Sequence, residues 1–288
     1  RRAGLPAAAA RRGAAAGGAA VTPLLQLQGA ALRLGAQAFG PFTLNLAAGE
    51  CVAILGPSGA GKSTLLKLMA GQSRPAAGTV VLDGRPLTGW RHAALARRRA
   101  VLPQQHAVAF AMAASLVVQL GRFAVEPDPA RERITTDALA AAHAGHLAGR
   151  RFDTLSGGEQ ARVQLARTLA QLWDVHGGLL LVDEPLAALD PGLQLELLAV
   201  LRDFARQRGH ALVAIVHDLN QALAGFERLW LVQQGRLLHD LPADRHALPA
   251  LARLFGVQLQ AVDGDDGRVG VLVRRAVVAA PVQEPVAT

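Results

Sequence analysis

The chain has 288 residues, of which 51% are hydrophobic and 18% are charged, enough for one globular domain with a subdomain. Its single cysteine, Cys51, excludes an intrachain disulfide framework and a cysteine-based metal site, and it fits a reducing compartment. The formal charge of +8 would suit an anionic partner, but no acidic residue precedes Glu50. Part of the excess therefore belongs to one end of the chain and does not by itself indicate nucleic acid.

Residues 1–23 form a leader rich in alanine, glycine and arginine. A paired arginine followed by small residues is compatible with a twin-arginine signal or a transit peptide. The segment lacks a compact run of leucine or valine, however, and Pro6 and several glycines interrupt it. We therefore expect a disordered extension.

Short apolar runs alternate with helical patterns along the rest of the chain, which predicts an α/β fold with a mixed sheet. The expected strands are 24–28, 42–46, 51–56, 79–84, 100–104, 178–183, 211–216 and 228–239, the last with a turn at Gln234-Gly235. The expected helices are about 62–70, 89–98, 113–121, 136–149, 157–173, 191–208, 219–226 and 246–254. The mostly helical segment of about 106–172 interrupts the strands and predicts an inserted helical subdomain, and residues 241–288 read as a C-terminal extension with a loose tail.

An uncharged stretch runs from Ala100 to Gly121. Its continuous apolar part, AVAFAMAASLVVQL, is shorter than the ~20 residues that a membrane-spanning helix needs. The stretch predicts a buried or partner-facing helix.

The segment GPSGAGKST follows the strand expected at 51–56 and precedes a helix, as a phosphate-binding P-loop requires. Its residues are Gly56, Pro57, Ser58, Gly59, Ala60, Gly61, Lys62, Ser63 and Thr64. The glycines allow successive backbone N–H groups to point inward, and the helix N-terminus adds positive potential. Lys62 can reach the β- and γ-phosphates of a nucleotide, and the Ser63 hydroxyl can ligate Mg²⁺.

A second acidic motif, GLLLVDEP, ends an apolar strand with Asp183 and Glu184. A carboxylate at the end of such a strand can hold Mg²⁺ beside a P-loop, and the next one can polarise an attacking water. No Asn-Lys-x-Asp motif occurs, which disfavours a GTPase.

The motif LSGGE comprises Leu155, Ser156, Gly157, Gly158 and Glu159. Ser156 and Glu159 form the pattern of a capping box, but this does not explain two adjacent glycines, which cost helix stability. Asp190 and Asp218 are each explained as N-caps of the following helix. His217 ends an apolar strand before such a cap, where it is either structural or a donor to a γ-phosphate.

The motifs GPSGAGKST, LPQQ, LSGGE, LLLVDEP and ALD, followed by His217, occur in this order, and the set resembles the ATP-binding cassette (ABC) family over residues 24–240. The resemblance implies that the P-loop binds ATP with Mg²⁺ as cofactor and that Ser63, Gln104 and Asp183 serve the metal. It further implies that Glu184 is the catalytic base and that Gln104 and His217 contact the water and the γ-phosphate. Residues 155–159 become the signature motif and Asp190 the D-loop.

One P-loop and one signature per chain imply a homodimer, in which each signature meets the nucleotide on the partner's P-loop. The stretches RRRAVLPQ, LSGGEQARVQLARTLAQLW and AIVHDLNQAL are similar to subunits of heme (hemin) importers, with ferric-siderophore and vitamin B12 importers as alternatives. This implies two transmembrane permease subunits, a periplasmic binding protein, and a location on the cytoplasmic side of the inner membrane. A soluble ABC ATPase acting on nucleic acid is disfavoured, because the chain has neither zinc cysteines nor a second cassette, whereas an exporter stays open.

Some residues depart from the family pattern or invite other interpretations. Leu34 stands where an adenine-stacking aromatic is usual, with Phe39 or Phe42 as substitutes, and Leu186 stands where Ser or Thr is common. His143 and His146 suggest a metal or heme pair, but we expect two surface histidines on one helical face. The run 97–99, three arginines, reads as compensation of a helix dipole.

Overall fold

The computed structural model describes residues 22–103, 111–183, 190–264 and 267–276, the side chains of 275 and 276 excepted. Its centre is a six-stranded sheet in the order β10-β9-β3-β8-β7-β6. The strands are β3 (Cys51–Leu55), β6 (Arg99–Leu102), β7 (Leu179–Asp183), β8 (Ala211–Ile215), β9 (Arg228–Gln233) and β10 (Arg236–Pro242). Strands β3, β6, β7, β8 and β9 run parallel. Strand β10 pairs antiparallel with β9 at the edge of the sheet, after the turn at Gln234 and Gly235, both at positive φ.

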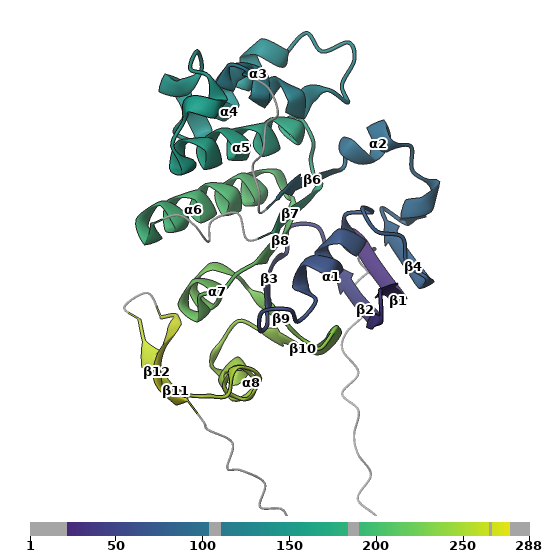
Figure 1. The fold of residues 1–288 in the computed structure, drawn as a ribbon, viewed down its shortest axis with the longest axis vertical. Coiled ribbons are helices and arrows are strands. Elements are labelled where there is room, and N and C mark those ends of the chain that lie inside the picture. The colour runs from purple at the N-terminus through teal and green to yellow at the C-terminus, as the bar shows by residue number, and fades with distance from the viewer. Residues whose placement is uncertain (1–21, 104–110, 184–189, 265–266, 277–288) are drawn as a thin grey trace, which may run out of the picture.

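A second sheet is antiparallel, in the order β2-β1-β4-β5, and lies beside α1 (Lys62–Met69) at one side of the central sheet (Figure 1). It comprises β1 (Leu25–Leu34), β2 (Gln37–Leu46), β4 (Ala77–Leu82) and β5 (Arg85–Pro86). The short α2 (His92–Ala96) follows a 3₁₀ turn, η1 (Leu87–Gly89), and is half as long as the sequence predicts. The expected mixture of parallel and antiparallel strands is confirmed.

The alternation of side chains along the central strands builds two cores. On β3, Cys51, Ala53 and Leu55 face one side, toward the helices, whereas Val52 and Ile54 face the antiparallel sheet and α1. All five are fully buried, as parallel strands covered on both faces require. Burial raises the pKa of the Cys51 thiol to about 11, so it remains a protonated core group.

Three helices form the inserted helical subdomain above the sheet: α3 (Ala114–Gln119), α4 (Arg131–Ala141) and α5 (Gly157–Gln171) (Figure 1). Short 3₁₀ turns, η2 (Leu120–Arg122), η3 (Gly145–Leu147) and η4 (Phe152–Thr154), connect them. The expected helix at 136–149 is wrong at both ends, because α4 begins at Arg131 and stops before His143, which adopts φ 54°. A residue in the left-handed conformation commonly ends a helix. That residue is usually a glycine, which a reader of the sequence would recognise, but here it is His143.

The chain then forms α6 (Pro191–Arg208) and α7 (Leu219–Gly225), both close to prediction, followed by the 3₁₀ turn η5 (Arg245–Ala247) and α8 (Leu248–Phe255). A hairpin of β11 (Val257–Asp263) and β12 (Val269–Ala276) ends the described chain and was not predicted. The Asn220 amide of α7 holds it, because its Nδ2 donates to the Val271 carbonyl and its Oδ1 accepts the Val271 N–H. No described helix is long and apolar enough to cross a membrane.

Candidate nucleotide-binding site

The carboxyl ends of three central strands bring the predicted site residues to one edge of the sheet. Strand pairing aligns Ile54 of β3 with Ile215 of β8, and Ile215 with Asp183 of β7. The P-loop therefore leaves β3 next to the point where His217 follows β8 and Asp183 ends β7. Ser63 and Asp183, which lie 120 positions apart in sequence, meet here because the sheet places β8 between β3 and β7.

Close backbone contacts fix the shape of the P-loop. A side chain on Gly56 would collide with the carbonyl oxygen of Val232 on β9, and one on Gly61, at φ 99°, would meet the ring of Phe39. The Gly235 N–H donates to the Ala60 carbonyl at 2.8 Å, so the β9–β10 turn supports the loop from outside. The loop shape thus depends on neighbours that lie far away in sequence.

Lys62 begins α1 and is only 5% exposed. Its Nζ donates to the carbonyl oxygens of Gly56 at 2.9 Å and Pro57 at 3.0 Å, both within the P-loop. The ammonium therefore lies inside the curl of the loop, as a group that is to contact phosphate oxygens must.

Ser63 and Asp183 form the contact expected of a Mg²⁺ site. The Ser63 hydroxyl donates to Asp183 Oδ1 at 2.9 Å, although 120 residues separate them. A hydroxyl and a carboxylate are hard oxygen donors, and Mg²⁺ is usually held by one or two carboxylates together with substrate phosphates. These two residues fit that ion.

Glu184 and Gln104 lie outside the described residues, as does Leu186. The side chain of His217 is exposed and lines a small pocket with Asp218, Asn220 and the C-terminal hairpin.

Asp218 accepts the Gln221 N–H at 2.7 Å and Asp190 accepts the Leu193 N–H at 2.9 Å, so the prediction that both aspartates are N-caps is confirmed.

The signature motif begins α5 with the predicted capping box. The Ser156 hydroxyl accepts the Glu159 N–H, and Glu159 Oε2 accepts the Ser156 N–H at 2.8 Å. This backbone hydrogen bond is the main cause that lowers the pKa of the Glu159 carboxyl. Arg162, one turn on, binds Glu196 of α6 with two contacts of 2.6 and 2.9 Å and so ties the signature helix to the helix that Asp190 caps.

The two signature glycines differ in their surroundings. A Cβ on Gly158 would approach Leu193 of α6 to 2.9 Å, whereas a Cβ on Gly157 would meet nothing within 4 Å and its φ is not positive. Packing inside the chain thus explains Gly158 only. Gly157 is exposed, and no contact in the described chain requires it to be a glycine.

Three exposed apolar residues, Leu116, Leu120 and Phe123, form an apolar ridge. The sequence predicts only a buried or partner-facing helix in this stretch. These residues are 46%, 45% and 84% exposed and lie at i, i+4 and i+7, on one side of α3 and η2. The opposite side buries Ala114, Val117 and Val118.

Three further expectations are answered by burial and backbone geometry. Phe42 is fully buried and Phe39 is 6% exposed, so neither ring is available to stack on adenine, whereas Leu34 is 54% exposed. His143 and His146 are exposed, as expected, but not on a helical face, because α4 has ended. His143 lies 3.2 Å from Glu196, and no cluster of three or more potential metal-binding side chains occurs among the described residues.

The chain was compared with known proteins. The ABC transporter family model matches residues 39–187. "Hemin import ATP-binding protein HmuV" of Pseudomonas aeruginosa is 47% identical over 219 residues, 75% of this chain and 86% of that protein. The protein of the same name from Pseudomonas entomophila is 44% identical over 241 residues, 82% of this chain and 94% of that protein.

Solved structures give the same fold. A transporter described as of the metal-chelate ABC type, in an inward-facing conformation, has a TM-score of 0.73 and 25% identity and covers 88% of this chain and 98% of its own. A dimeric ATP-binding cassette in a post-hydrolysis state, bound to ADP and Pi, has a TM-score of 0.66 and 25% identity and covers 76% and 98%. The predicted α/β P-loop fold with its helical insertion is thereby confirmed.

Proposed function

Because this chain belongs to the ABC transporter family and is an ATPase of that family, we propose that it is the energy-coupling subunit of an importer for heme. The observation that carries the proposal is the meeting of the P-loop with Asp183 at one sheet edge, in a chain 47% identical to a hemin import subunit. The substrate follows from that similarity alone, since nothing in the cassette would touch it.

The contacts of Lys62, Ser63 and Asp183 support their proposed roles in hydrolysis, and the roles of Glu184 and Gln104 rest on the family resemblance. Lys62 binds the β- and γ-phosphates, for which it exchanges its present carbonyl partners. Ser63 and Asp183 would hold Mg²⁺, which would supply positive charge to neutralise the phosphate oxygens. Glu184 serves as general base for the attacking water, with Gln104 beside the water and metal and His217 donating to the γ-phosphate.

The complete catalytic unit is a homodimer. Gly157 presents bare backbone at the N-terminus of a 15-residue helix, where free N–H groups and the helix dipole favour an anion. We place the γ-phosphate held by the partner's P-loop there. Asp190 caps the helix braced to this one through Arg162 and Glu196, so the D-loop and the signature move together.

The apolar ridge receives the membrane subunits. Three exposed apolar side chains on one helix face are typical of a protein–protein contact, and a pair of permease subunits would cover one ridge on each protomer. The ATPase would then lie on the cytoplasmic side of the inner membrane, with a periplasmic binding protein on the other side.

A reconstituted complex tests this function. The chain would be co-expressed with the proposed permease subunits and placed in proteoliposomes with the periplasmic binding protein. We expect heme-loaded binding protein to stimulate ATP hydrolysis and heme uptake, and Lys62→Ala to abolish both. Stimulation by a ferric siderophore or by vitamin B12 in place of heme would overturn the substrate but leave the ATPase in place.

A second measurement tests the ridge. Phe123→Ser should reduce co-purification of the permease at least tenfold while ATP binding by the isolated subunit is unchanged. Leu238→Ser provides the control, because Leu238 is equally apolar and 45% exposed but lies on β10, away from the ridge. Equal retention of the permease by both variants would refute the assignment of the ridge.

A further inference from the structure

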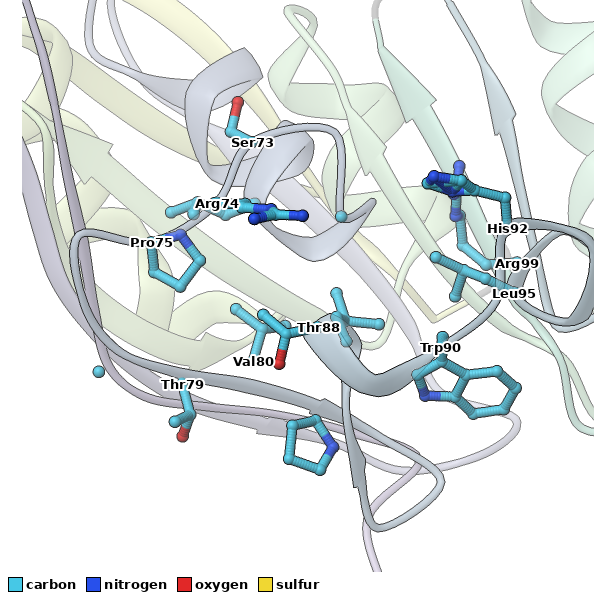
Figure 2. A pocket seen from close by; sticks show the side chains of 15 residues that line it. Ser73, Arg74, Pro75, Thr79, Val80, Thr88, Trp90, His92, Leu95 and Arg99 are labelled. Atoms are coloured by element: carbon cyan, nitrogen blue, oxygen red, sulfur yellow. The ribbon is translucent and has the colours of Figure 1, made fainter.

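A cavity of about 320 Å³ lies away from the nucleotide site, between α1, α2 and the antiparallel sheet (Figure 2). Its lining includes Leu68 and Gly71 at the C-terminal end of α1, whereas Lys62 lies at the other end. An eight-residue helix is about 12 Å long, so the cavity is separate from the phosphate site. Its volume is at the lower end of the range for small-molecule sites.

The polar part of the lining is cationic. Arg74, His92 and Arg99 line the cavity, and no aspartate or glutamate does among the residues that the structure describes. In Figure 2 His92 and Arg99 lie together above Trp90, and Arg74 lies apart from them, across the cavity.

Arg99 is the lining residue with a buried side-chain nitrogen that lacks a hydrogen-bond partner among the described residues. Its neighbour Arg98 binds Asp83 through two contacts of 2.7 and 3.0 Å and also donates to two carbonyls, whereas Arg99 Nε is buried without a hydrogen-bond partner. Neither Arg99 nor Arg74 forms an ion pair with any residue that the structure describes. Burial lowers the pKa of the Arg99 guanidinium. Arg99 is thus a partly buried cation without a carboxylate partner in the described part of the chain.

This arrangement corrects the interpretation of the arginine run. Only Arg97 lies at the C-terminal end of α2, where it is the C-cap residue, while Arg99 already belongs to β6. Compensation of the helix dipole therefore does not explain Arg99.

The remaining lining is apolar and aromatic. Leu87 and Trp90 are partly buried against the core, and Leu68 and Val80 are buried. An apolar wall with a few convergent charges is the composition of a ligand site rather than of a solvent-filled gap.

We propose that this cavity binds a small organic anion: a carboxylate, sulfonate or phosphate monoester attached to an apolar ring or short chain. The acidic group contacts Arg99, with Arg74 adding positive charge to the cavity, and the apolar body packs against Leu87 and Trp90. The site is independent of the P-loop and of the transport substrate.

A pair of fluorescent probes tests the proposal on the full chain. 1-Anilinonaphthalene-8-sulfonate carries the anion, and N-phenyl-1-naphthylamine is the same molecule without it. Titrations are made with the phosphate site saturated by the magnesium complex of AMP-PNP, so that sulfonate binding at the P-loop is excluded. Any probe that binds to the apolar ridge would keep the same Kd when Arg99 is substituted, so it can be told apart from probe in the cavity.

We expect Arg99→Met to raise the Kd of the sulfonate probe about tenfold or more, because a hydrogen-bonded charge contact is lost. Arg97→Met, the matched control, should change it less than twofold, and the uncharged probe should bind all variants alike. Arg74→Met, at an exposed position, provides a second variant should Arg99→Met fail to fold. Equal sulfonate affinity in the wild type, Arg74→Met and any folded Arg99→Met, or equal loss of both probes, would overturn the proposal.

Discussion

Gly157 and Gly158 are adjacent in sequence but have different physical roles. A side chain at Gly158 would require Leu193 of the neighbouring helix to shift, whereas Gly157 faces open space with an ordinary helical backbone. A glycine in a helix costs up to about 1 kcal/mol relative to alanine. A residue that costs stability and is not required by the fold points to a contact outside the chain.

Gly157→Ala should therefore separate stability from activity. We expect the free energy of unfolding to rise by up to about 1 kcal/mol in urea titrations, because the helix gains propensity. ATP hydrolysis should fall at least tenfold, because the added methyl group stands between the helix N-terminus and the partner's phosphate. Gly145→Ala is the control, as its Cβ would also meet nothing; wild-type turnover in Gly157→Ala would contradict the proposed role.

His210 is a buried histidine that the mechanism does not use. It is fully buried, and its Nδ1 accepts the N–H of Gly178, the residue that precedes β7, at 2.8 Å. Burial above all, and then the charge of Arg208, lowers its pKa from 6.5 to about 4. The folded protein therefore holds the neutral ring.

This predicts an acid-sensitive contribution to stability. Because the folded pKa lies below the unfolded one, the contribution is fully present above pH 6.5 and is lost as the pH falls from 6.5 to about 4. We expect a loss of about 2–3 kcal/mol in the free energy of unfolding over that window. His210→Asn should flatten the dependence and His239→Asn, at an exposed position, should not; parallel curves for all three proteins would show that His210 is not responsible.

At the scale of elements, a buried ion pair holds the helical subdomain together. Arg122 of η2 is fully buried and binds Asp128 with contacts of 2.9 and 3.0 Å and Asp174, beyond α5, with contacts of 2.7 and 3.0 Å. The hydrogen bonds from Arg122 are the main cause that lowers the pKa of Asp128. This network joins the end of α3 to the end of the signature helix.

Asp128→Asn should cost about 3 kcal/mol of unfolding free energy, because it leaves the buried charge of Arg122 with only the half-exposed Asp174. Asp137→Asn, which removes the exposed pair with Arg133, should cost less than about 1 kcal/mol. The difference in unfolding free energy between the wild type and Asp128→Asn should be full above about pH 4. It should disappear as the pH falls further, because the pKa of Asp128 is lower in the folded than in the unfolded protein. Equal urea midpoints for the two variants would refute the structural role of Arg122.

For the whole molecule, the decisive feature is that the two halves of the proposed nucleotide site occupy different parts of one chain. The P-loop and Asp183 lie at the sheet edge, and the signature turn begins a helix of the inserted subdomain (Figure 1). In the proposed homodimer, two copies arranged head to tail would complete two sites, and nucleotide would favour the closed arrangement.

Glu184→Gln should trap that arrangement. Amide substitution removes the general base but not the phosphate contacts, so we expect ATP hydrolysis to fall at least 100-fold and a dimer to persist in ATP and Mg²⁺. Light scattering after size exclusion measures the state. The double variant Lys62→Ala/Glu184→Gln should stay monomeric, and a monomeric single variant with undiminished turnover would contradict the assignment.

The sequence by itself determined the local features of this protein. The P-loop could be recognised from its motif, and the capping box at Ser156, the cap at Asp190 and the turn at Gln234-Gly235 each depend on interactions within a few residues. The hairpin of β11 and β12 shows the limit, because its alternating pattern was visible in VQLQAV but weak without the α7 amide that holds it.

Only the tertiary structure decided what non-local contacts control. It ended α4 at a left-handed histidine, buried Phe39 and Phe42, separated the roles of Gly157 and Gly158, and placed Arg99 unpaired beside a cavity. The physical reason is the same in each case. Burial and steric contact depend on which segments pack together, and residues more than a hundred positions apart, such as Ser63 and Asp183, become neighbours only when the strands assemble into the sheet.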